Sequence, residues 1–389
     1  MKILAINGGT SGSSWNICRS ILDAASIKGH DVYAATPNEK PADFLHSYYK
    51  IGNKIDRLFN KFITKIDGSD GFRNKLATNR LLSYISKIKP DVVHLHTLHG
   101  HFINIGLLIQ FLKSNRIKLI ITCHDCWWFT GRCAHFFSNS CNCWKNDGCK
   151  KCRFKNAYPK TFFVDKASKF LFQKKQLFEN YDNLTIVCVS DWLRDLCLDS
   201  LVFRNCNVLT IHNGVDTSIY DLPSENLICT NFNLISVASQ WNNSKGIEII
   251  LALAKIYPNL NFTVVGKLSN RVSLPKNVSN ISTIQSKYVL NKLYQQSYAL
   301  LNPSTQETFS LVNVEAQLCG LPVICMNETG MTETVSKESY RVNEYSLESF
   351  KKAIDLTIST KFERNKIRLF AETFSLEKMI YNYLEVYTK

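Results

Sequence analysis

Two glutamates with seven residues between them are the clearest candidates for binding a sugar or a nucleotide. Glu307 comes just before a stretch with helical periodicity, and Glu315 lies about two turns inside that stretch. A carboxylate accepts paired hydrogen bonds from vicinal hydroxyls, which sugars and ribose both carry. Free backbone N–H groups at the start of a helix can bind phosphate. The residues at this helix start are Thr308, Phe309, Ser310 and Leu311. By spacing alone, two solvated glutamates on a surface helix are the simpler interpretation.

A glycine-rich turn offers a second candidate site for an anion. Residues 8–14 read Gly-Gly-Thr-Ser-Gly-Ser-Ser and separate the first expected strand from the first expected helix. Gly8, Gly9 and Gly12 let the backbone approach a diphosphate closely, and the helix N-terminus adds N–H groups. The turn is neither a P-loop nor a regular dinucleotide fingerprint. Many turns of this composition are only tight turns.

A histidine at the end of an expected strand is a third candidate. His124 lies in the run Thr122-Cys123-His124-Asp125. In open α/β sheets, ligands bind at the carboxyl ends of the strands, which favours a functional role for His124. A lone histidine is nevertheless often structural. The nearby histidines illustrate how common this is, although two of them, His96 and His99, also fall near a strand end; the others are His94 and His101.

Cysteine is concentrated in one segment. Seven of the fourteen cysteines lie between Cys123 and Cys152. Cys149-x-x-Cys152 supplies one pair of metal ligands, and Cys133 and Cys141 could complete a tetrahedral structural zinc site. The spacing is looser than in standard zinc ribbons. Reduced, partly buried thiols are the alternative interpretation.

The elements that must position these groups alternate between strand and helix. Short, nearly continuous apolar runs predict parallel strands that are buried on both faces. In the first half these strands are Ile3–Asn7, Asp31–Ala35, Val92–Leu95, Leu119–Cys123, Thr185–Val189 and Val208–Ile211. The helical stretches include Asn16–Lys28, Ile103–Lys113 and Trp192–Ser200. This alternation predicts an α/β fold with a doubly wound parallel sheet.

The same pattern restarts after residues 212–216, so we expect two domains. Strands are predicted at Asn233–Ala238, Asn261–Val265, Ala299–Leu301 and Pro322–Met326. Helices are predicted at Gly246–Tyr257, Lys287–Ser297, Phe309–Cys319, Leu347–Ser359 and Leu376–Tyr387. We place an N-terminal Rossmann-like domain at 1–216, a second Rossmann-like domain at 217–370 and a final helix, packed back on the first domain, at 371–389. Residues 125–153 are predicted to be a Cys-rich insertion, and Asp221–Thr230 a linker.

Composition restricts the class of protein. Apolar residues make up 45% of the chain and charged residues 20%, as in ordinary globular proteins. No apolar run is long enough to span a membrane, and no signal peptide is visible at the start, so we expect a cytoplasmic protein. The net charge of +15 is scattered, which favours an anionic membrane surface and a phosphorylated substrate over nucleic acid. A merely basic protein is the alternative.

The segment 302–324, which contains both glutamates, resembles the donor-binding signature of glycosyltransferase family 4. Further matches are Lys245-Gly246 after a strand, His212–Asp216, Val264-Val265-Gly266, and Gly330 with Glu333. The segment from Cys126 to Cys152 resembles a subgroup associated with bacterial polysaccharide assembly. The resemblance implies a GT-B fold, with two Rossmann-like domains, a donor in the cleft between them and retention of anomeric configuration. It makes 1–216 the acceptor-side domain and 217–370 the donor-binding domain.

Residue by residue, the resemblance assigns three roles in donor binding. Glu307 would bind the donor-sugar hydroxyls, Glu315 the ribose, and Lys245 would neutralise the diphosphate, with Gly266 in the same donor site. His124 would touch the sugar near the reacting carbon, so that His124, Glu307 and Lys245 form the catalytic set.

The sequence departs from the family pattern at one cation. Many members carry an arginine where this chain has Gln240. Arg271 or Lys267 could substitute, or backbone amides could bind the diphosphate.

These observations predict a retaining hexosyltransferase that uses a nucleoside diphosphate sugar, UDP- or GDP-linked, in surface polysaccharide synthesis. No Asp-x-Asp motif occurs, so we expect catalysis without a divalent metal, with zinc in a structural role only. The expected acceptor is lipid-linked or an oligosaccharide at the inner membrane face. The alternative is a non-catalytic protein of the same fold that binds nucleotide sugars or polyanions.

Overall fold

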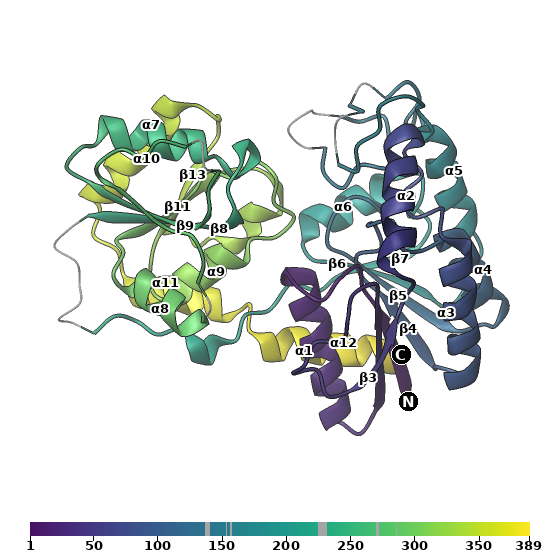
Figure 1. Cartoon of the computed structure of the whole chain (residues 1–389). Helices are drawn as coiled ribbons and strands as arrows, with labels where there is room; N and C mark the ends of the chain where they lie inside the picture. The colour runs from purple at the N-terminus through teal and green to yellow at the C-terminus, as the bar shows by residue number, and fades with distance from the viewer. Residues whose placement is uncertain (137–140, 153, 156–157, 225–231, 270–271, 285) are drawn as a thin grey trace. The chain divides into compact units, whose positions relative to one another are not determined.

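The computed structural model describes residues 1–136, 141–152, 154–155, 158–224, 232–269, 272–284 and 286–389. The chain forms two compact units, each built on one parallel sheet (Figure 1). The first unit contains Met1–Ile211 and Ile380–Lys389, and the second contains His212–Met379.

The sheet of the first unit has the strand order β3-β2-β1-β4-β5-β6-β7, with every pair parallel. Its strands are β1 (Lys2–Ile6), β2 (Asp31–Thr36), β3 (Ser47–Lys50), β4 (Val92–Leu95), β5 (Lys118–Cys123), β6 (Leu184–Cys188) and β7 (Asn207–Thr210). Its helices are α1 (Ser13–Ile27), α2 (Lys54–Asp67), α3 (Lys75–Ile88), α4 (Ile105–Ser114), α5 (Ala167–Phe178) and α6 (Asp191–Asp199). The strand order reverses between β1 and β4, which is where such sheets bind ligands.

The second unit repeats this design with the order β10-β9-β8-β11-β12-β13. Its strands are β8 (Asn233–Gln240), β9 (Asn261–Lys267), β10 (Val278–Ile281), β11 (Ala299–Asn302), β12 (Val323–Met326) and β13 (Tyr340–Val342). Its helices are α7 (Ile247–Ile256), α8 (Lys287–Gln295), α9 (Leu311–Leu318), α10 (Leu347–Ser359) and α11 (Arg364–Glu372). The reversal falls between β8 and β11.

The central strands form because most of their residues are apolar and all of them can be buried. All four residues of β4, β11 and β12 are buried. Helices α3, α4 and α5 lie side by side against the first sheet (Figure 1). Such coverage explains why these strands read as continuous apolar runs rather than as alternating patterns.

The predicted α/β class and the two parallel sheets are confirmed, and the predicted elements lie within a few residues of the observed ones. The predicted elements did not include β3, β10, β13 and α11, and the helices given as examples for the first half did not name α2, α3 and α5. As a result, the strand that ends at Cys123 is the fifth of its sheet and not the fourth. The last helix, α12, spans Leu376–Thr388.

The division between the units falls between Ile211 and His212, a few residues before the expected boundary. The expected linker Asp221–Thr230 therefore begins inside the second unit, and its residues 225–230 lie outside the described part of the chain. The end of α12 belongs to the first unit, where Tyr387 OH lies 2.7 Å from His94 Nδ1.

Residues 124–166 form neither helix nor strand in their described parts. The segment is nonetheless anchored by aromatic side chains, because Trp127, Trp128 and Trp144 are almost fully buried. Regular structure resumes only with α5, beyond the end of the predicted Cys-rich insertion at residues 125–153. Among the described helices, none has the length and apolar character needed to cross a membrane.

Candidate active site

The reversal point of the second sheet carries an ion pair between two of the predicted catalytic residues. Lys245 lies in the loop that follows β8, and Glu307 lies in the loop that follows β11. Lys245 Nζ is 2.5 Å from Glu307 Oε1. The side chains are 32% and 17% exposed, so both remain within reach of a ligand.

Close packing between the two loops sets this geometry. Gly246 has a φ of 76°, and a Cβ there would lie 2.6 Å from the carbonyl oxygen of Pro303. Thr305 donates its N–H to the Ser244 carbonyl at 2.9 Å, which ties the loops together. Asn242 accepts the N–H of Lys245 at 3.1 Å. A larger residue than glycine at 246 would therefore separate Lys245 from Glu307.

The N-terminus of α9 follows Glu307 after three residues. Helix α9 begins at Leu311, two residues later than expected, with Ser310 as its N-cap residue. Thr308 and Phe309 are also buried, and the Phe309 ring packs against that of His212 at 5.9 Å. The backbone N–H groups in the first turn of α9, which begins at Leu311, are the kind of group that binds an anion at a helix start.

A buried polar network that the sequence reasoning missed fixes α9 in place. Asn302 donates to Asn313 at 2.8 Å and to Ser310 at 3.1 Å. Gln317 donates to the Thr334 carbonyl at 2.6 Å. The amides Asn313 and Gln317 lie on the helix between and after the two glutamates, and polar residues at buried helical positions were the signal that could have revealed them.

Glu315 lies in the second turn of α9 and is 8% exposed. Burial raises the pKa of its carboxyl group, while the charge of Lys287 and the Tyr294 hydroxyl oppose that rise. Tyr294 OH approaches Glu315 Oε2 at 3.5 Å. The Tyr220 hydroxyl also stabilises this carboxylate. Since two carboxylate oxygens together accept about four hydrogen bonds, Glu315 retains the capacity to accept ligand hydroxyls.

A cavity of about 350 Å³ opens at the carboxyl ends of β8 and β9 and at the start of α8. Gly266 lines this cavity. A Cβ added at position 266 would collide with the Ala238 carbonyl oxygen, so no other residue fits there. Lys267 and Lys287 line the same cavity. Gln240 pairs with Lys267 in the sheet, which places Lys267 beside the position of the missing arginine. Arg271, the other predicted substitute, lies outside the described residues.

The glycine-rich turn belongs to the reversal point of the first sheet. Gly8 and Gly9 line a cavity of about 510 Å³ together with His99. A Cβ on Gly8 would lie 2.8 Å from the Thr97 carbonyl oxygen, so the close approach of the two loops requires a glycine. Gly12 has a φ of 82° and is the N-cap residue of α1.

His124 directly follows β5 and is half-buried. Its Nε2 lies 3.0 Å from His96 Nδ1, and the two rings stack. Burial lowers the pKa of His124 to about 4, so the imidazole is neutral at physiological pH. The neighbouring Asp125 pairs instead with His99, at 2.9 Å. The His99–Asp125 pair is a feature that the sequence reasoning had not singled out.

The four predicted zinc ligands, Cys133, Cys141, Cys149 and Cys152, line one cavity of about 520 Å³. Around a tetrahedral zinc ion, sulfurs would lie about 3.8 Å apart. In the described part of the chain, no three of these four sulfurs lie within 4.8 Å of one another. The cysteines thus share one cavity without forming a closed ligand set.

A different set of thiols does converge. Cys123, Cys188 and Cys197 are fully buried, and their sulfurs lie within 4.8 Å of one another. Cys188 Sγ and Cys197 Sγ are 3.4 Å apart. These residues come from β5, β6 and α6, so their proximity follows from sheet topology and not from sequence spacing.

The structure therefore brings together Lys245, Glu307 and the start of α9, with Glu315 further along the same helix. Gly266 lines its own cavity in the same unit. The glycine-rich turn and His124 belong to the first unit.

Comparison with known proteins identifies the family. Residues 15–219 match the family model described as Glycosyltransferase Family 4, and residues 221–373 match the one described as Glycosyl transferases group 1. The putative colanic acid biosynthesis glycosyl transferase WcaC of Escherichia coli (strain K12) is 25% identical over 359 residues, covering 87% of this chain and 86% of the relative. The alpha-monoglucosyldiacylglycerol synthase of Acholeplasma laidlawii is 24% identical over 318 residues, covering 78% and 74%.

The solved structures agree in fold. The structure of Anabaena Alr3699/HepE in complex with UDP-glucose superimposes with a TM-score of 0.68 and 13% identity, covering 100% of this chain and 99% of that one. Likeness to glycosyltransferase structures of this kind shows that the two units have the GT-B fold. Since the first family model alone covers more than half of the 389 residues, the chain belongs to glycosyltransferase family 4.

Proposed function

We propose that this protein is a retaining glycosyltransferase that moves a sugar from a nucleoside diphosphate sugar to an acceptor hydroxyl. The observation that carries the proposal is the Lys245–Glu307 ion pair in front of the N-terminus of α9. One cation, one carboxylate and the N–H groups of a helix start match the diphosphate and the sugar hydroxyls of such a donor.

Catalysis depends on the charge of the leaving group. As the glycosidic bond breaks, negative charge grows on the departing diphosphate and positive charge grows on the sugar. Lys245 and the α9 N–H groups stabilise the diphosphate, and no divalent metal is required. Glu307 orients the donor sugar by accepting hydrogen bonds from the sugar hydroxyls. Front-side attack by the acceptor then gives retention of the anomeric configuration. His124 acts on the sugar as a neutral hydrogen-bonding group.

The nucleoside part of the donor is assigned to other residues of the second unit. Glu315 binds the ribose hydroxyls, and the cavity at Gly266, with Lys267 and Lys287, takes the nucleotide. The complex of Anabaena Alr3699/HepE with UDP-glucose favours a uridine nucleotide. GDP remains the second candidate.

The acceptor is proposed to be a lipid-linked or growing oligosaccharide of a bacterial surface polysaccharide. The name of the WcaC relative, which refers to colanic acid biosynthesis, supports the polysaccharide. The name of the diacylglycerol-lipid synthase supports an acceptor held in a membrane. The location of the enzyme in the cytoplasm, at the inner face of the membrane, stays a prediction.

A thermal-shift panel with UDP, GDP and dTDP tests the donor site. A nucleotide at 100 times its Kd should add about 2.7 kcal/mol to the free energy of unfolding. The corresponding nucleotide sugar should then be hydrolysed slowly, with release of the nucleoside diphosphate. Binding without any release would favour the alternative, a non-catalytic nucleotide-sugar-binding protein. No stabilisation by any of the three nucleotides would contradict both.

A further inference from the structure

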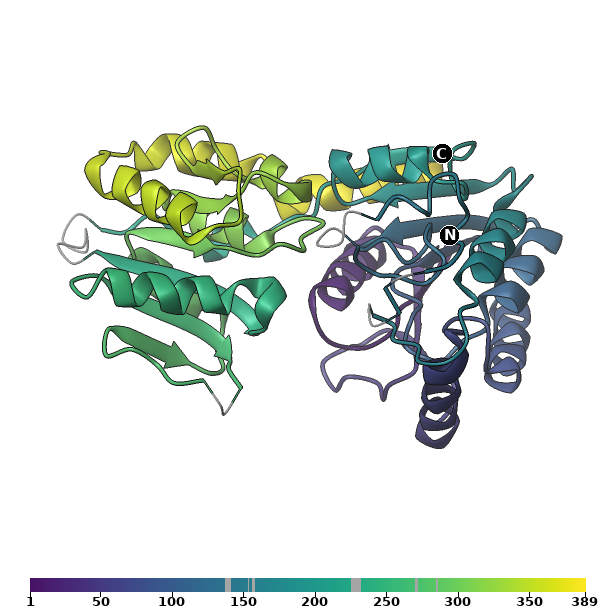
Figure 2. The same ribbon diagram turned by 90° about the horizontal axis from the view of Figure 1, so that it is seen from above.

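Helix α2 exposes its apolar stripe and buries polar residues, which reverses the usual orientation of a surface helix. The stripe has the helical spacing i, i+3, i+4, i+7, and its side chains are 63–78% exposed. It consists of Ile55, Leu58, Phe59 and Phe62. The buried face of the helix consists of Asn60, Thr64 and Asp67. In Figure 2, α2 is the dark blue helix that projects from the body of the first unit.

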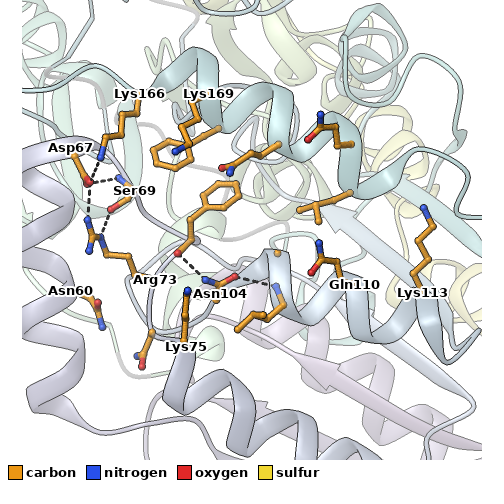
Figure 3. A pocket seen from close by; sticks show the side chains of 18 residues that line it. Asn60, Asp67, Ser69, Arg73, Lys75, Asn104, Gln110, Lys113, Lys166 and Lys169 are labelled. Carbon is orange, nitrogen blue, oxygen red and sulfur yellow. Dashed lines mark hydrogen bonds and ion pairs between the residues drawn. The ribbon is translucent and has the colours of Figure 1, made fainter.

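Ion pairs hold the polar side of α2 inward. Asp67 Oδ2 lies 2.7 Å from Arg73 and 2.8 Å from Lys166, on the wall of a cavity of about 820 Å³ (Figure 3). These partners hold the pKa of Asp67 at about 2, although its burial opposes this. Turning the apolar stripe inward would remove this carboxylate from both cations. The exposed orientation is therefore fixed by the fold.

The ends of the helix are equally well defined. The Asn53 side chain accepts the N–H of Asp56 at 2.8 Å, as an N-cap does. Gly68 closes the helix with a φ of 70°, and its N–H bonds to the Thr64 carbonyl. The apolar stripe thus lies on a complete, capped helix and not on a frayed segment.

More exposed apolar residues continue the stripe at its C-terminal end. Phe162 and Val164 donate their N–H groups to the carbonyls of Lys65 and Ile66, at 2.7 and 2.9 Å. Phe163 between them is 74% exposed. We call the four residues of the stripe together with Phe162, Phe163 and Val164 the apolar face. An apolar face of this extent on a described surface normally contacts a partner.

Basic side chains border the apolar face on one flank. Successive residues of an α-helix are turned by about 100°, which places Lys54, Lys61 and Lys65 together beside the stripe. All three are exposed. An exposed apolar stripe flanked by lysines is the composition of a helix that lies in the interface of an anionic membrane.

We propose that the apolar face of α2 docks this enzyme on an anionic phospholipid surface. The apolar side chains would enter the boundary between headgroups and acyl chains, and the lysines would contact the lipid phosphates. The inference deepens the proposed function and rests on it for the lipid-linked acceptor.

The same helix borders the cavity at the glycine-rich turn. Arg57, Leu58 and Lys61 of α2 line that cavity with Gly8 and Gly9. Leu58 belongs both to the stripe and to the cavity wall, so the lipid-facing surface is continuous with the reversal point of the first sheet. An acceptor whose lipid stays in the membrane would have a short path to this cavity.

Vesicle co-sedimentation of the full chain, without donor or acceptor, tests the proposal. At low salt the protein should sediment with phosphatidylglycerol/phosphatidylcholine vesicles and remain in the supernatant with phosphatidylcholine alone. Replacing Phe59 and Phe62 together by serine should weaken binding by about tenfold or more, since buried aromatic area is lost. Replacing Lys54 and Lys65 by glutamine should weaken binding to the anionic vesicles by about fivefold per lysine. Added salt should also weaken this binding, because it screens the attraction between the lysines and the lipid phosphates.

Matched controls separate docking from general surface effects. Leu356→Ser with Leu369→Ser removes apolar side chains of similar exposure, 52% and 63%, from the second unit and should leave binding unchanged. All these side chains are exposed, so thermal midpoints should hardly move. Wild-type protein that stays in the supernatant, or a Phe59/Phe62 variant that binds as wild type does, would overturn the proposal.

A second copy of the chain is the rival occupant of the apolar face. Light scattering that shows a dimer, lost in the Phe59/Phe62 variant, would assign the face to self-association and overturn docking on lipid. Nucleotide binding and donor hydrolysis need no membrane. Failure of docking is therefore distinguishable from failure of the proposed function.

Discussion

Lys245 Nζ lies 2.5 Å from Glu307 Oε1 across the reversal point of the second sheet. The two residues have different proposed roles, one on the diphosphate and one on the sugar, yet in the structure each is the other's ion-pair partner. Ion pairs of such exposure contribute only about 0–1 kcal/mol. A diphosphate can therefore share Lys245 at little cost, and Glu307 then becomes available to sugar hydroxyls.

The first prediction concerns Lys245. Lys245→Ala should lower kcat by about a hundredfold, as when one preorganised charge partner is lost, and should weaken donor binding much less. The reason is that the leaving group gains charge in the transition state. Lys255→Ala, on the exposed side of α7, is the matched control and should behave as wild type. Rates from initial velocities and Kd from calorimetry separate the two effects. Wild-type turnover in Lys245→Ala would transfer the role to other cations or to backbone amides.

Much of this site could be predicted from sequence, because its residues lie in short segments next to regular elements. The spacing of Glu307 and Glu315 already placed one carboxylate before a helix and the other inside it. The pairing of Glu307 with Lys245 could not be predicted, since it depends on Gly246 packing against Pro303. Sequence spacing contains no such information about contacts between loops.

The second prediction concerns Glu315. Glu315→Ala should weaken nucleotide binding by about 1.5–3 kcal/mol, the value of hydrogen bonds to a charged group. An ordinary glutamate has a pKa of about 4.3. Burial raises the pKa of Glu315, so Glu315 takes up a proton at a higher pH than an ordinary glutamate does. Protonation removes an acceptor, so donor affinity should fall as the pH drops through this raised pKa. Glu315→Gln should bind weakly at all pH values and lose that dependence. Calorimetric Kd values that are unchanged in Glu315→Ala would remove the ribose role.

The third prediction concerns metal. If Cys133, Cys141, Cys149 and Cys152 close around zinc, protein prepared without chelators should contain about one equivalent, as structural sites bind tightly. Cys149→Ser with Cys152→Ser should remove the zinc, whereas Cys206→Ser, outside the cavity, should retain it. Metal analysis without zinc would leave reduced thiols as the account of this segment.

EDTA provides the complementary test of metal-free catalysis. Transfer should continue in EDTA at the wild-type rate, provided that the chelator leaves any structural zinc in place. A rate that falls with EDTA and returns with Mg²⁺ or Mn²⁺ would contradict the proposed role of Lys245 and the α9 amides.

Helix α2 shows where sequence patterns stop being informative about orientation. Its apolar spacing predicts a helix and would normally predict a buried apolar face. The reverse occurs because Asp67 is held inside by Arg73 and Lys166, one of them about a hundred residues away in sequence. Which face of a helix is buried depends on such tertiary partners and not on the pattern alone.

The last prediction concerns His124, whose place at the end of a buried strand favours a functional role and whose catalytic role is what the family resemblance implies. The structure places its Nε2 3.0 Å from His96 Nδ1, in surroundings that lower the pKa of His124 to about 4. A lowered pKa means that the proton is taken up only in acid, so the ring is neutral from about pH 4 upward and can hydrogen-bond the sugar without opposing its positive charge. His124→Ala should therefore lower kcat by about a hundredfold and leave nucleotide Kd and the thermal midpoint nearly unchanged. His124→Gln, which keeps an N–H donor of similar reach, should recover part of the rate, and His30→Ala serves as the control. In the wild type, the contribution of His124 to kcat should be constant at neutral pH and lost only as the pH falls through about 4. A His124→Ala enzyme with wild-type kcat would limit this histidine to a structural role, packing against His96. A loss of rate that is matched by an equal loss of stability would also indicate a structural role.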